Sequence, residues 1–308
     1  MSDVWDELDG RIIMDPMRPS VGCSHPGCHG IVDLSIELVY QYLQDNAVRC
    51  PSCGHEFSLW TAIRLSIERE LTPLVYGLSG ASTMGLGYVL ESEKRYWIDL
   101  NAAGLPKDVR IVSRQYSEGK GFRVVEATGS QPGGWSFPTQ YGLITIPHLE
   151  ASSETADVMV AVTFIDESIL SNAAGRQFFL ACDLFLRHED YGLVAVVAHS
   201  AIELAVEQTI ARYAAQAVVS KRAFRFAEGL QEAAAVNVLA PVLAANLGVP
   251  AMKSHMQGSL DALRKARNGS AHGGEPVPRS DVVNGLATVF FHLAWLGFIA
   301  SRLPSPRS

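Results

Sequence analysis

The sequence predicts a multidomain α+β protein with three consecutive domains. Three observations support this: paired cysteines near the start, short β-rich runs between turn-forming residues in the middle, and long apolar periodic runs toward the end. The expected domains are a cysteine-bearing module with flanking helices at 1–76, a small all-β sandwich or barrel at 77–167, and an all-α helical bundle at 168–308. With 48% hydrophobic and 19% charged residues, the chain has the composition of globular material.

Four of the five cysteines form two close pairs, Cys23 with Cys28 and Cys50 with Cys53. Two tight turns that each present two thiolates match the tetrahedral preference of zinc, and Gly54 permits the positive φ that such a turn requires. Because four thiolates complete the coordination shell, the pattern predicts a structural zinc in a zinc-ribbon-like module. Four unliganded cysteines in a small domain are the alternative.

Three histidines lie close to these cysteines, and two short helices are expected in the same domain. Since the cysteines already form a complete ligand set, the histidines are expected not to bind the metal; they are His25, His29 and His55. One helix is expected between 33 and 46 and a second from 59 to about 74.

The middle of the chain is rich in turn-forming residues and β-branched runs. Strands are expected at 96–100, 110–116, 122–126, 141–146 and 158–165. The glycine-rich run 77–87 has a phosphate loop as one interpretation, but no Lys-Ser/Thr pair follows it and no βαβ unit surrounds it. It is therefore expected to be a turn-rich lead-in to a domain that serves as a spacer or a binding surface.

The last part of the chain is expected to be helical. Helices are predicted at 173–187, 193–216, 221–243, 252–268 and 281–303, the last with Ser280 or Asp281 as its N-cap. Cys182 lies within an apolar helix face and is expected to be a core residue. The apolar run 286–303 has about the minimum length for a bilayer span, but it contains His292, so we expect a buried bundle helix.

The net charge and the first residues of the sequence indicate the cellular location and the kinds of partner to expect. The net charge of -7 argues against a protein that coats nucleic acid non-specifically, although the C-terminal half is mildly basic. The acidic start has no apolar region of the kind found in signal peptides, and close cysteine pairs favour metal over disulfides. A cytoplasmic protein without a membrane partner is expected.

The segment Arg267-Asn268-Gly269-Ser270-Ala271-His272 combines residue types that can process a phosphodiester. Arginine offers a permanently charged fork for phosphate oxygens, and histidine moves protons near neutral pH. On an ideal helix the two side chains lie about 140° apart, so the hypothesis requires Gly269 to end the helix. The alternative is an ordinary helix C-terminus, where basic residues meet the negative end of the dipole.

The helical part resembles the HEPN (higher eukaryotes and prokaryotes nucleotide-binding) domains. The resemblance rests on Arg267 and His272 with the polar Asn268 after the arginine, and on Ala198-His199-Ser200-Ala201-Ile202-Glu203-Leu204 in an earlier helix. HEPN domains are helical bundles, usually dimeric, and many are metal-independent endoribonucleases with an Arg-x4–6-His motif. Gly269 lies inside this motif, and the family includes degenerate copies that only bind.

The resemblance implies an endoribonuclease that cleaves cellular RNA, with tRNA as one candidate substrate, by attack of the 2′-hydroxyl. Arg267 would hold the phosphate, His272 would act as general acid or base, and Asn268 would orient a partner or contact a phosphate. The protein would act as a homodimer and as a toxin or antiviral-defence effector, with a regulatory partner protein as a further expectation. The alternative is a non-catalytic dimeric adaptor that binds nucleotide, RNA or protein. A zinc-ribbon DNA-binding regulator is a weaker third hypothesis.

Other polar residues of the helical part have structural interpretations. His199 and Glu203 share a helix face and are expected to form a buried polar pair. The alternative is that they contribute to the candidate catalytic site. His255 and His292 are expected to be ordinary helix residues. Two basic groups have RNA guidance or a solvated helix face as equal alternatives: Lys221-Arg222-Arg225 and Arg264-Lys265-Arg267.

Overall fold

The computed structural model describes residues 6–7, 11–17, 19–91, 96–100, 102–117, 143–146, 155–216 and 235–303. The chain forms two compact units: unit 1 contains 1–19 and 80–169, and unit 2 contains 20–79 and 170–308. The cysteine-bearing segment thus groups with the C-terminal helices, which differs from the three consecutive domains expected from the sequence. The physical reason is that both stretches of unit 2 contribute side chains to one apolar core.

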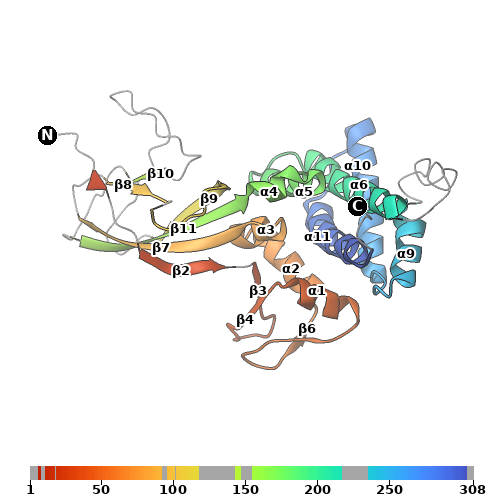
Figure 1. Cartoon of the computed structure of the whole chain (residues 1–308), viewed down its shortest axis with the longest axis horizontal. Coiled ribbons are helices and arrows are strands. Elements are labelled where there is room, and N and C mark those ends of the chain that lie inside the picture. The colour runs from red at the N-terminus through yellow and green to blue at the C-terminus, as the bar shows by residue number, and fades with distance from the viewer. Residues whose placement is uncertain are drawn as a thin grey trace. The chain divides into compact units, whose positions relative to one another are not determined.

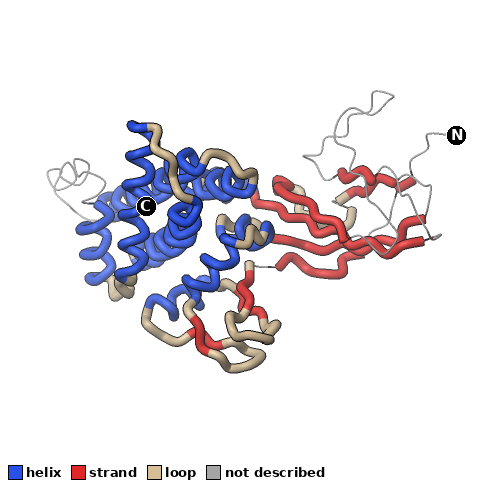
Figure 2. The backbone as a smooth tube through the Cα atoms, turned by 180° about the vertical axis from the view of Figure 1, so that it is seen from behind, coloured by secondary structure: helices blue, strands red, loops and turns tan. Residues whose placement is uncertain are grey.

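Unit 1 contains two small sheets, drawn in red in Figure 2. The larger has the order β2 (Arg11–Met17), β7 (Ser82–Glu91), β11 (Thr155–Asp166), β9 (Val109–Ser117), and the smaller has β1 (Asp6–Glu7), β8 (Tyr96–Asp99), β10 (Leu143–Ile146). The strands predicted at 96–100, 110–116, 141–146 and 158–165 are confirmed, and 122–126 lies outside the described residues. In the described part of the chain the larger sheet is open, with β2 and β9 as its edges.

The glycine-rich run 77–87 is not the turn-rich lead-in that we predicted, because most of it belongs to strand β7. The alternating side chains of Met84, Leu86 and Tyr88 are 0%, 0% and 3% exposed. They lie opposite Val162, Val160 and Val158 of β11, respectively. Packing of these apolar pairs outweighs the low strand preference of the intervening glycines.

The first stretch of unit 2 carries the cysteines between short elements. They are β3 (Ser20–Gly22), β4 (Ile31–Asp33), α1 (Ile36–Leu43), β5 (Val48–Arg49), β6 (Glu56–Phe57), α2 (Leu59–Glu68) and α3 (Thr72–Leu78). The helix predicted within 33–46 is confirmed as α1, and the Ser35 hydroxyl caps it by accepting the Leu38 N–H at 3.1 Å. The helix predicted from 59 to about 74 is confirmed from Leu59 to Glu68 as α2, but it does not continue to 74. Glu70 adopts a left-handed φ of 55° between α2 and α3, and Pro73 lies in the first turn of α3.

The second stretch of unit 2 is helical. It contains α4 (Glu167–Ser171) at its boundary, then α5 (Ala173–Leu186), α6 (Tyr191–Gln216), the π-helical turn η1 (Ala235–Leu239), α9 (Ala240–Asn246), α10 (Ser254–Gly273) and α11 (Arg279–Arg302). The helices predicted at 173–187, 193–216 and 281–303 are confirmed. The N-cap of α11 is Pro278 and not Ser280 or Asp281. The helix predicted at 221–243 lies partly outside the described residues, and η1 and α9 cover its end.

Helix α11 forms the centre of unit 2. Figure 1 shows it in dark blue among α2, α6, α9 and α10, and it packs against all four. Its Leu286, Phe291 and Ile299 are 0% exposed and share one core with Leu59 and Ile63 of α2. Cys182 is also 0% exposed in this core, which confirms its predicted structural role.

Two helices of unit 2 are long and apolar enough to cross a bilayer by length and composition alone. They are α6 and α11, and their apolar windows are 56% and 67% buried inside the fold. Burial of this kind is also found in core helices of folded bundles, so the helices are weak evidence for a membrane. The cytoplasmic location remains a prediction.

Candidate functional site

The four cysteines Cys23, Cys28, Cys50 and Cys53 meet at one place in unit 2. Their Sγ atoms all lie within 4.8 Å of one another and can hold a metal ion. The Cys23–Cys53 and Cys28–Cys50 Sγ distances are both 3.7 Å. A tetrahedral ion with bonds of about 2.3 Å to sulfur requires sulfur–sulfur edges of about 3.8 Å. Two of the sulfur–sulfur distances therefore match the edge of a tetrahedral site, and all of the others are at most 4.8 Å.

Backbone turns position these thiols. Gly27 and Gly54 adopt φ of 75° and 71°, so the positive φ predicted for Gly54 is confirmed. Gly30 is needed for a different reason: a Cβ on it would lie 2.5 Å from the Cys50 Sγ. The backbone of this glycine therefore passes close to the ligand cluster, where no larger residue fits.

Backbone N–H groups also donate to the sulfur atoms. The His25 N–H donates to the Cys23 Sγ at 3.4 Å, and the Gly30 N–H donates to the Cys28 Sγ at 3.3 Å. Burial raises the pKa of Cys50, but N–H donation from Cys53 and Ser52 outweighs it and lowers the pKa to about 6. The N–H donors to Cys23 and Cys28 lower the pKa values of these thiols, but burial and the neighbouring thiols raise them above the usual value, so Cys50 is the cysteine favoured as the thiolate, the form that binds a metal ion.

The neighbouring histidines lie outside the group of four candidate ligands. The rings of His25 and His55 contact each other with centroids 4.8 Å apart at the surface of the cluster. Neither these two nor His29 belongs to the ligand group found among the described residues. Their predicted status as bystanders remains a prediction.

The second candidate site lies on α10, which does not end at Gly269 as the hypothesis required. The helix continues through Ser270 and His272 to Gly273, and Gly274 then caps it with a left-handed φ of 63°. A helix tolerates an internal glycine, and Gly274 supplies the positive φ that ends it. Arg267 and His272 therefore lie on one continuous helix, about 140° apart and about 7.5 Å along the axis.

Arg267 is held by two acceptors. Its Nη1 donates to the Asn268 Oδ1 at 2.9 Å, and its Nη2 donates to the Glu203 Oε1 of α6 at 3.2 Å. The Arg267 side chain is 31% exposed and that of Glu203 is 22% exposed. Asn268 contacts the guanidinium of its neighbour Arg267, and its role in a reaction stays a prediction. The guanidinium is fixed at the junction of α6 and α10, with part of it reachable from solvent.

His199 lies next to this pair but inside the core. Its Nδ1 is 3.3 Å from the Glu203 Oε1, and its side chain is 2% exposed. Burial lowers the pKa of His199; the carboxylate of Glu203 raises it, and the charges of Arg267 and Arg264 lower it further. The polar pair predicted for His199 and Glu203 is therefore present, and it extends to Arg267.

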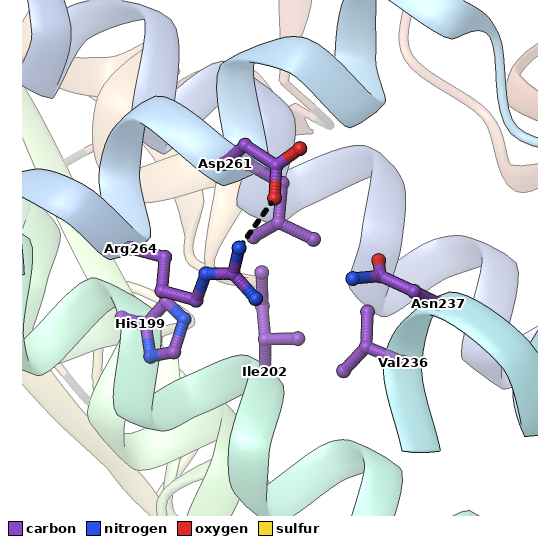
Figure 3. Close-up of a pocket in the computed structure, with 7 residues that line it drawn as sticks. His199, Ile202, Val236, Asn237, Asp261 and Arg264 are labelled. Carbon is purple, nitrogen blue, oxygen red and sulfur yellow. Dashed lines mark ion pairs between the residues drawn. The ribbon is translucent and has the colours of Figure 1, made fainter. Parts of the chain in front are cut away.

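A small hollow adjoins this cluster, lined by residues of α6, η1 and α10. In Figure 3 the guanidinium of Arg264 points into it, with His199 on one side and Asn237 on the other. Arg264 is paired with Asp261 at 3.1 Å, one turn earlier on α10. The hollow is open to solvent, and the empty space at its mouth and inside it together amounts to about 240 Å3. An apolar wall of Ile202 and Leu260 faces these polar groups.

The remaining predicted residues are separate from the cluster. His272 is exposed near the end of α10, and Lys265 is exposed on the same helix. His255 contacts Trp60 edge-on at 5.1 Å. His292 is 2% exposed, its Nδ1 lies 2.9 Å from the Thr288 carbonyl oxygen, and burial lowers its pKa to about 4. The basic group 221–225 lies outside the described residues.

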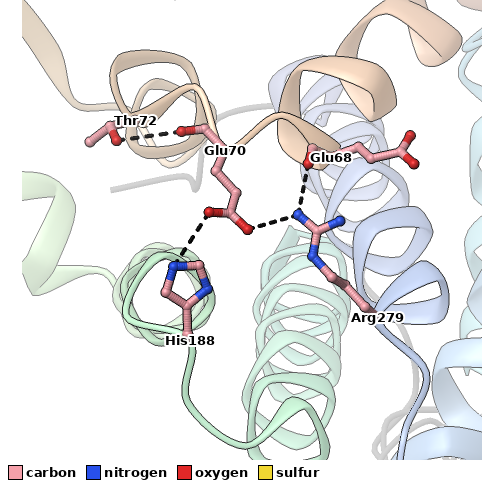
Figure 4. A network of polar contacts seen from close by, with 5 residues as sticks. All are labelled: Glu68, Glu70, Thr72, His188 and Arg279. Atoms are coloured by element: carbon pink, nitrogen blue, oxygen red, sulfur yellow. Dashed lines mark hydrogen bonds and ion pairs between the residues drawn. The ribbon is translucent and has the colours of Figure 1, made fainter.

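A separate polar network ties the cysteine-bearing stretch to the helices of unit 2 (Figure 4). Arg279, the first residue of α11, donates from Nη2 to the Glu68 carbonyl at 2.7 Å and to the Glu70 Oε1 at 2.8 Å. His188, in the turn between α5 and α6, approaches the other oxygen of Glu70 at 3.4 Å. The break between α2 and α3 is therefore anchored on two helices from the other stretch of sequence.

Comparison with protein-family models, with curated proteins and with solved structures finds no match for this chain. The geometry of the two sites therefore carries the functional argument. The sequence singled out Arg267, Asn268 and His272 but did not connect Arg267 to Glu203. The helical spacing of His199 and Glu203 was the available signal, and it does not reveal a contact across 64 positions of sequence.

Proposed function

We propose that the protein is a metal-independent endoribonuclease whose phosphate-binding group is Arg267. The observation that carries this proposal is the setting of the Arg267 guanidinium: it is oriented by Glu203 and Asn268, is 31% exposed, and precedes the exposed His272 on the same helix. An oriented, reachable arginine stabilises the charge that develops on a phosphate under attack. The resemblance of the helical part to HEPN domains supports the same reaction.

In this reaction the 2′-hydroxyl of RNA attacks the adjacent phosphate and leaves a cyclic phosphate end, so the reaction itself needs no metal ion. One group must take the proton of the 2′-hydroxyl and one must supply a proton to the leaving 5′-oxygen. His272 is the group proposed for one of these transfers. Because His272 and Arg267 diverge by about 140° on a continuous helix, one chain presents them poorly to a single phosphate. A homodimer through the C-terminal helices, in which two copies face one RNA, is therefore part of the proposal.

The test compares the wild-type protein with His272→Ala and Arg267→Ala on total cellular RNA in EDTA. Arg176→Ala is the matched control, because it removes an exposed positive charge from α5, outside the basic groups considered for RNA. We expect cleavage by wild type and Arg176→Ala, and loss of cleavage in the two site variants. RNA left intact by all four proteins, or cut equally by all four, contradicts the proposal.

The cysteine cluster is proposed to hold zinc as a structural ion. Four thiolates leave no open position for a substrate, and their 3.7 Å spacings fit a tetrahedral zinc site. Cys50→Ser should lose the metal and fold poorly, measured by metal analysis and circular dichroism. A wild-type protein that folds stably without metal refutes this part. The zinc-ribbon-like module and the HEPN-like bundle belong to the same proposal.

One observation favours a second function, a non-catalytic dimeric adaptor that binds nucleotide, RNA or protein. The charge of Arg267 is already balanced by Glu203 within the chain, so a phosphate must compete with a carboxylate for the guanidinium. In this case Arg267→Ala weakens RNA binding in a filter or polarisation assay, while no variant affects RNA integrity. The enzyme proposal also carries three expectations: cellular RNA as the substrate, a toxin or defence activity, and a regulatory partner protein.

A further inference from the structure

Glu203 occupies a bridging position between two helices. Its Oε1 accepts from the Arg267 Nη2 of α10 at 3.2 Å and lies 3.3 Å from the Nδ1 of His199, one turn earlier on α6. The same oxygen therefore faces both the buried imidazole and the guanidinium. A carboxylate that is 22% exposed loses hydration, and the arginine partner offsets this loss.

The contacts leave part of the guanidinium available. An arginine has five N–H donors, and the contacts to Glu203 and Asn268 use one from Nη2 and one from Nη1. Three N–H donors remain for another acceptor, and a phosphate accepts two of them in parallel. Since the two occupied donors are on different nitrogens, the plane of the guanidinium cannot turn without breaking a contact.

His199 approaches the same carboxylate oxygen as Arg267, but as a neutral ring. Burial lowers the pKa of His199, Glu203 raises it, and Arg267 and Arg264 lower it, with a net lowering from its usual value, so the ring adds no positive charge beside Glu203 near pH 7. Arg267 is therefore a charged partner of Glu203 across the contact of α6 with α10. The charged groups around His199 are Glu203 on its own helix and Arg264 and Arg267 on α10.

We propose that Glu203 is a positioning residue that orients Arg267 so that the remaining N–H groups of the guanidinium face an RNA phosphate. The expected effect on RNA cleavage rests on the proposed ribonuclease function, whereas the orientation of Arg267 by Glu203 is a property of the protein without RNA. Glu203 does not contact substrate; it acts through Arg267. Removal of its charge therefore frees the guanidinium to rotate and lowers the rate of the chemical step more than the affinity for RNA.

The first experiment observes Arg267 directly, without any reaction. The side-chain Nε–H signal of Arg267 in nitrogen-15 NMR is assigned by its disappearance in Arg267→Lys. It is then compared among wild type, Glu203→Gln and Glu203→Asp, with Glu207→Gln as the matched control. Glu207 is exposed and one turn further along α6, so its variant removes the same charge from the same helix. We expect the signal to shift and broaden in Glu203→Gln alone, with partial recovery in Glu203→Asp.

The second experiment measures single-turnover cleavage and RNA affinity for the same proteins. Glu203→Gln should lower the cleavage rate about 100-fold, the loss expected for a catalytic group misplaced by about 1 Å, while RNA affinity changes by less than about threefold. Glu203→Asp should recover part of the rate, and Glu207→Gln should match wild type. Thermal melting of each variant confirms that the fold is retained.

The outcomes separate this inference from the proposed function. An Arg267 signal that changes in Glu203→Gln while wild type cleaves no RNA supports the positioning contact and counts against the ribonuclease. An unchanged Arg267 signal in Glu203→Gln, or a full cleavage rate in that variant, overturns the positioning role. If Glu203→Gln unfolds, Glu203→Asp provides the same comparison, because it keeps the charge but shortens the side chain. An unchanged Arg267 signal and an unchanged cleavage rate in Glu203→Asp would then overturn the inference.

Discussion

Gly30→Ala adds one methyl group at the backbone position closest to the cysteine cluster. A Cβ at this position would lie 2.5 Å from the Cys50 Sγ, 2.8 Å from the Ser52 Oγ and 2.9 Å from the Ser52 Cβ. Ordinary van der Waals contact begins at 3.4 Å, so the Cys50 sulfur must move by about 0.9 Å. Cys50 and Ser52 share one turn, and neither is a long side chain that can swing aside. The turn itself must therefore shift.

This displacement exceeds what a zinc site accepts. Ligand distances in such sites hold to within about 0.2 Å, so a shift of about 0.9 Å removes Cys50 from the coordination shell or distorts the other three ligands. Changes that only reorient a ligand typically cost about 10- to 100-fold in metal affinity. We expect a loss of at least about 100-fold for Gly30→Ala, which is about 2.7 kcal/mol.

The assay is zinc content of the purified protein together with competition against a chromogenic chelator. The matched control is Gly22→Ala in the same hairpin of β3 and β4, where an added Cβ has nothing within 4 Å. Gly22→Ala should keep the wild-type metal content and affinity. A Gly30→Ala protein that holds one equivalent of zinc as tightly as Gly22→Ala would refute the reasoning from close approach.

Three further predictions concern stability and pH. Ile63→Ala removes a 0% exposed side chain from the core that α2 shares with α11, so we expect the free energy of unfolding to fall by about 2–5 kcal/mol. Unfolding of unit 2, followed by the helical circular dichroism signal, should stay one cooperative transition. Separate transitions for the cysteine-bearing stretch and the helices would contradict the shared core. Burial lowers the pKa of His292 to about 4 from its usual value near 6.5, so the unfolded chain binds that proton more readily. The corresponding stability is complete above about pH 6.5 and is lost as the pH falls toward 4, by up to about 3 kcal/mol. His292→Phe should flatten that dependence in denaturant titrations, and an equal pH slope in both proteins would exclude His292 as its source. Because protons compete with zinc for thiolates, chelator competition should show zinc affinity falling steadily from pH 8 to 5.5, whereas a constant affinity would argue against four thiolate ligands.

Local patterns in the sequence predicted much of the fold correctly. Cysteine pairs at short spacing identified the cluster that could hold a metal ion, because each pair is held by its own turn. The helices at 173–187 and 193–216 were likewise evident from periodicity. Signals of this kind depend on residues within a few positions of one another.

The wrong predictions concern segments where contacts between residues far apart in the sequence outweigh the local sequence pattern. Glycines at 85 and 87 suggested turns, but pairing of β7 with β11 decided the structure, and the partners of these two glycines lie 76 and 72 residues away. Gly269 suggested a helix end, but Gly274 at the end of α10 is the residue that adopts positive φ. The contact of Glu203 with Arg267 and the joining of the cysteine-bearing stretch to the helices are likewise long-range, and no local pattern encodes them.

The grouping of the chain into units has a consequence for synthesis on the ribosome. The first stretch of unit 2 is made early, but its apolar partners in α5, α6 and α11 emerge only after the residues 80–169 of unit 1. Leu59 and Ile63 therefore remain without most of their core until α11 has been synthesised, and the nascent chain is open to aggregation or chaperone capture in that interval. Antiparallel pairing of β7 with β11 places Ser82 opposite Phe164. Folding of unit 1 thus brings the two ends of the intervening segment together and reduces the loop-closure entropy that the late helices must overcome.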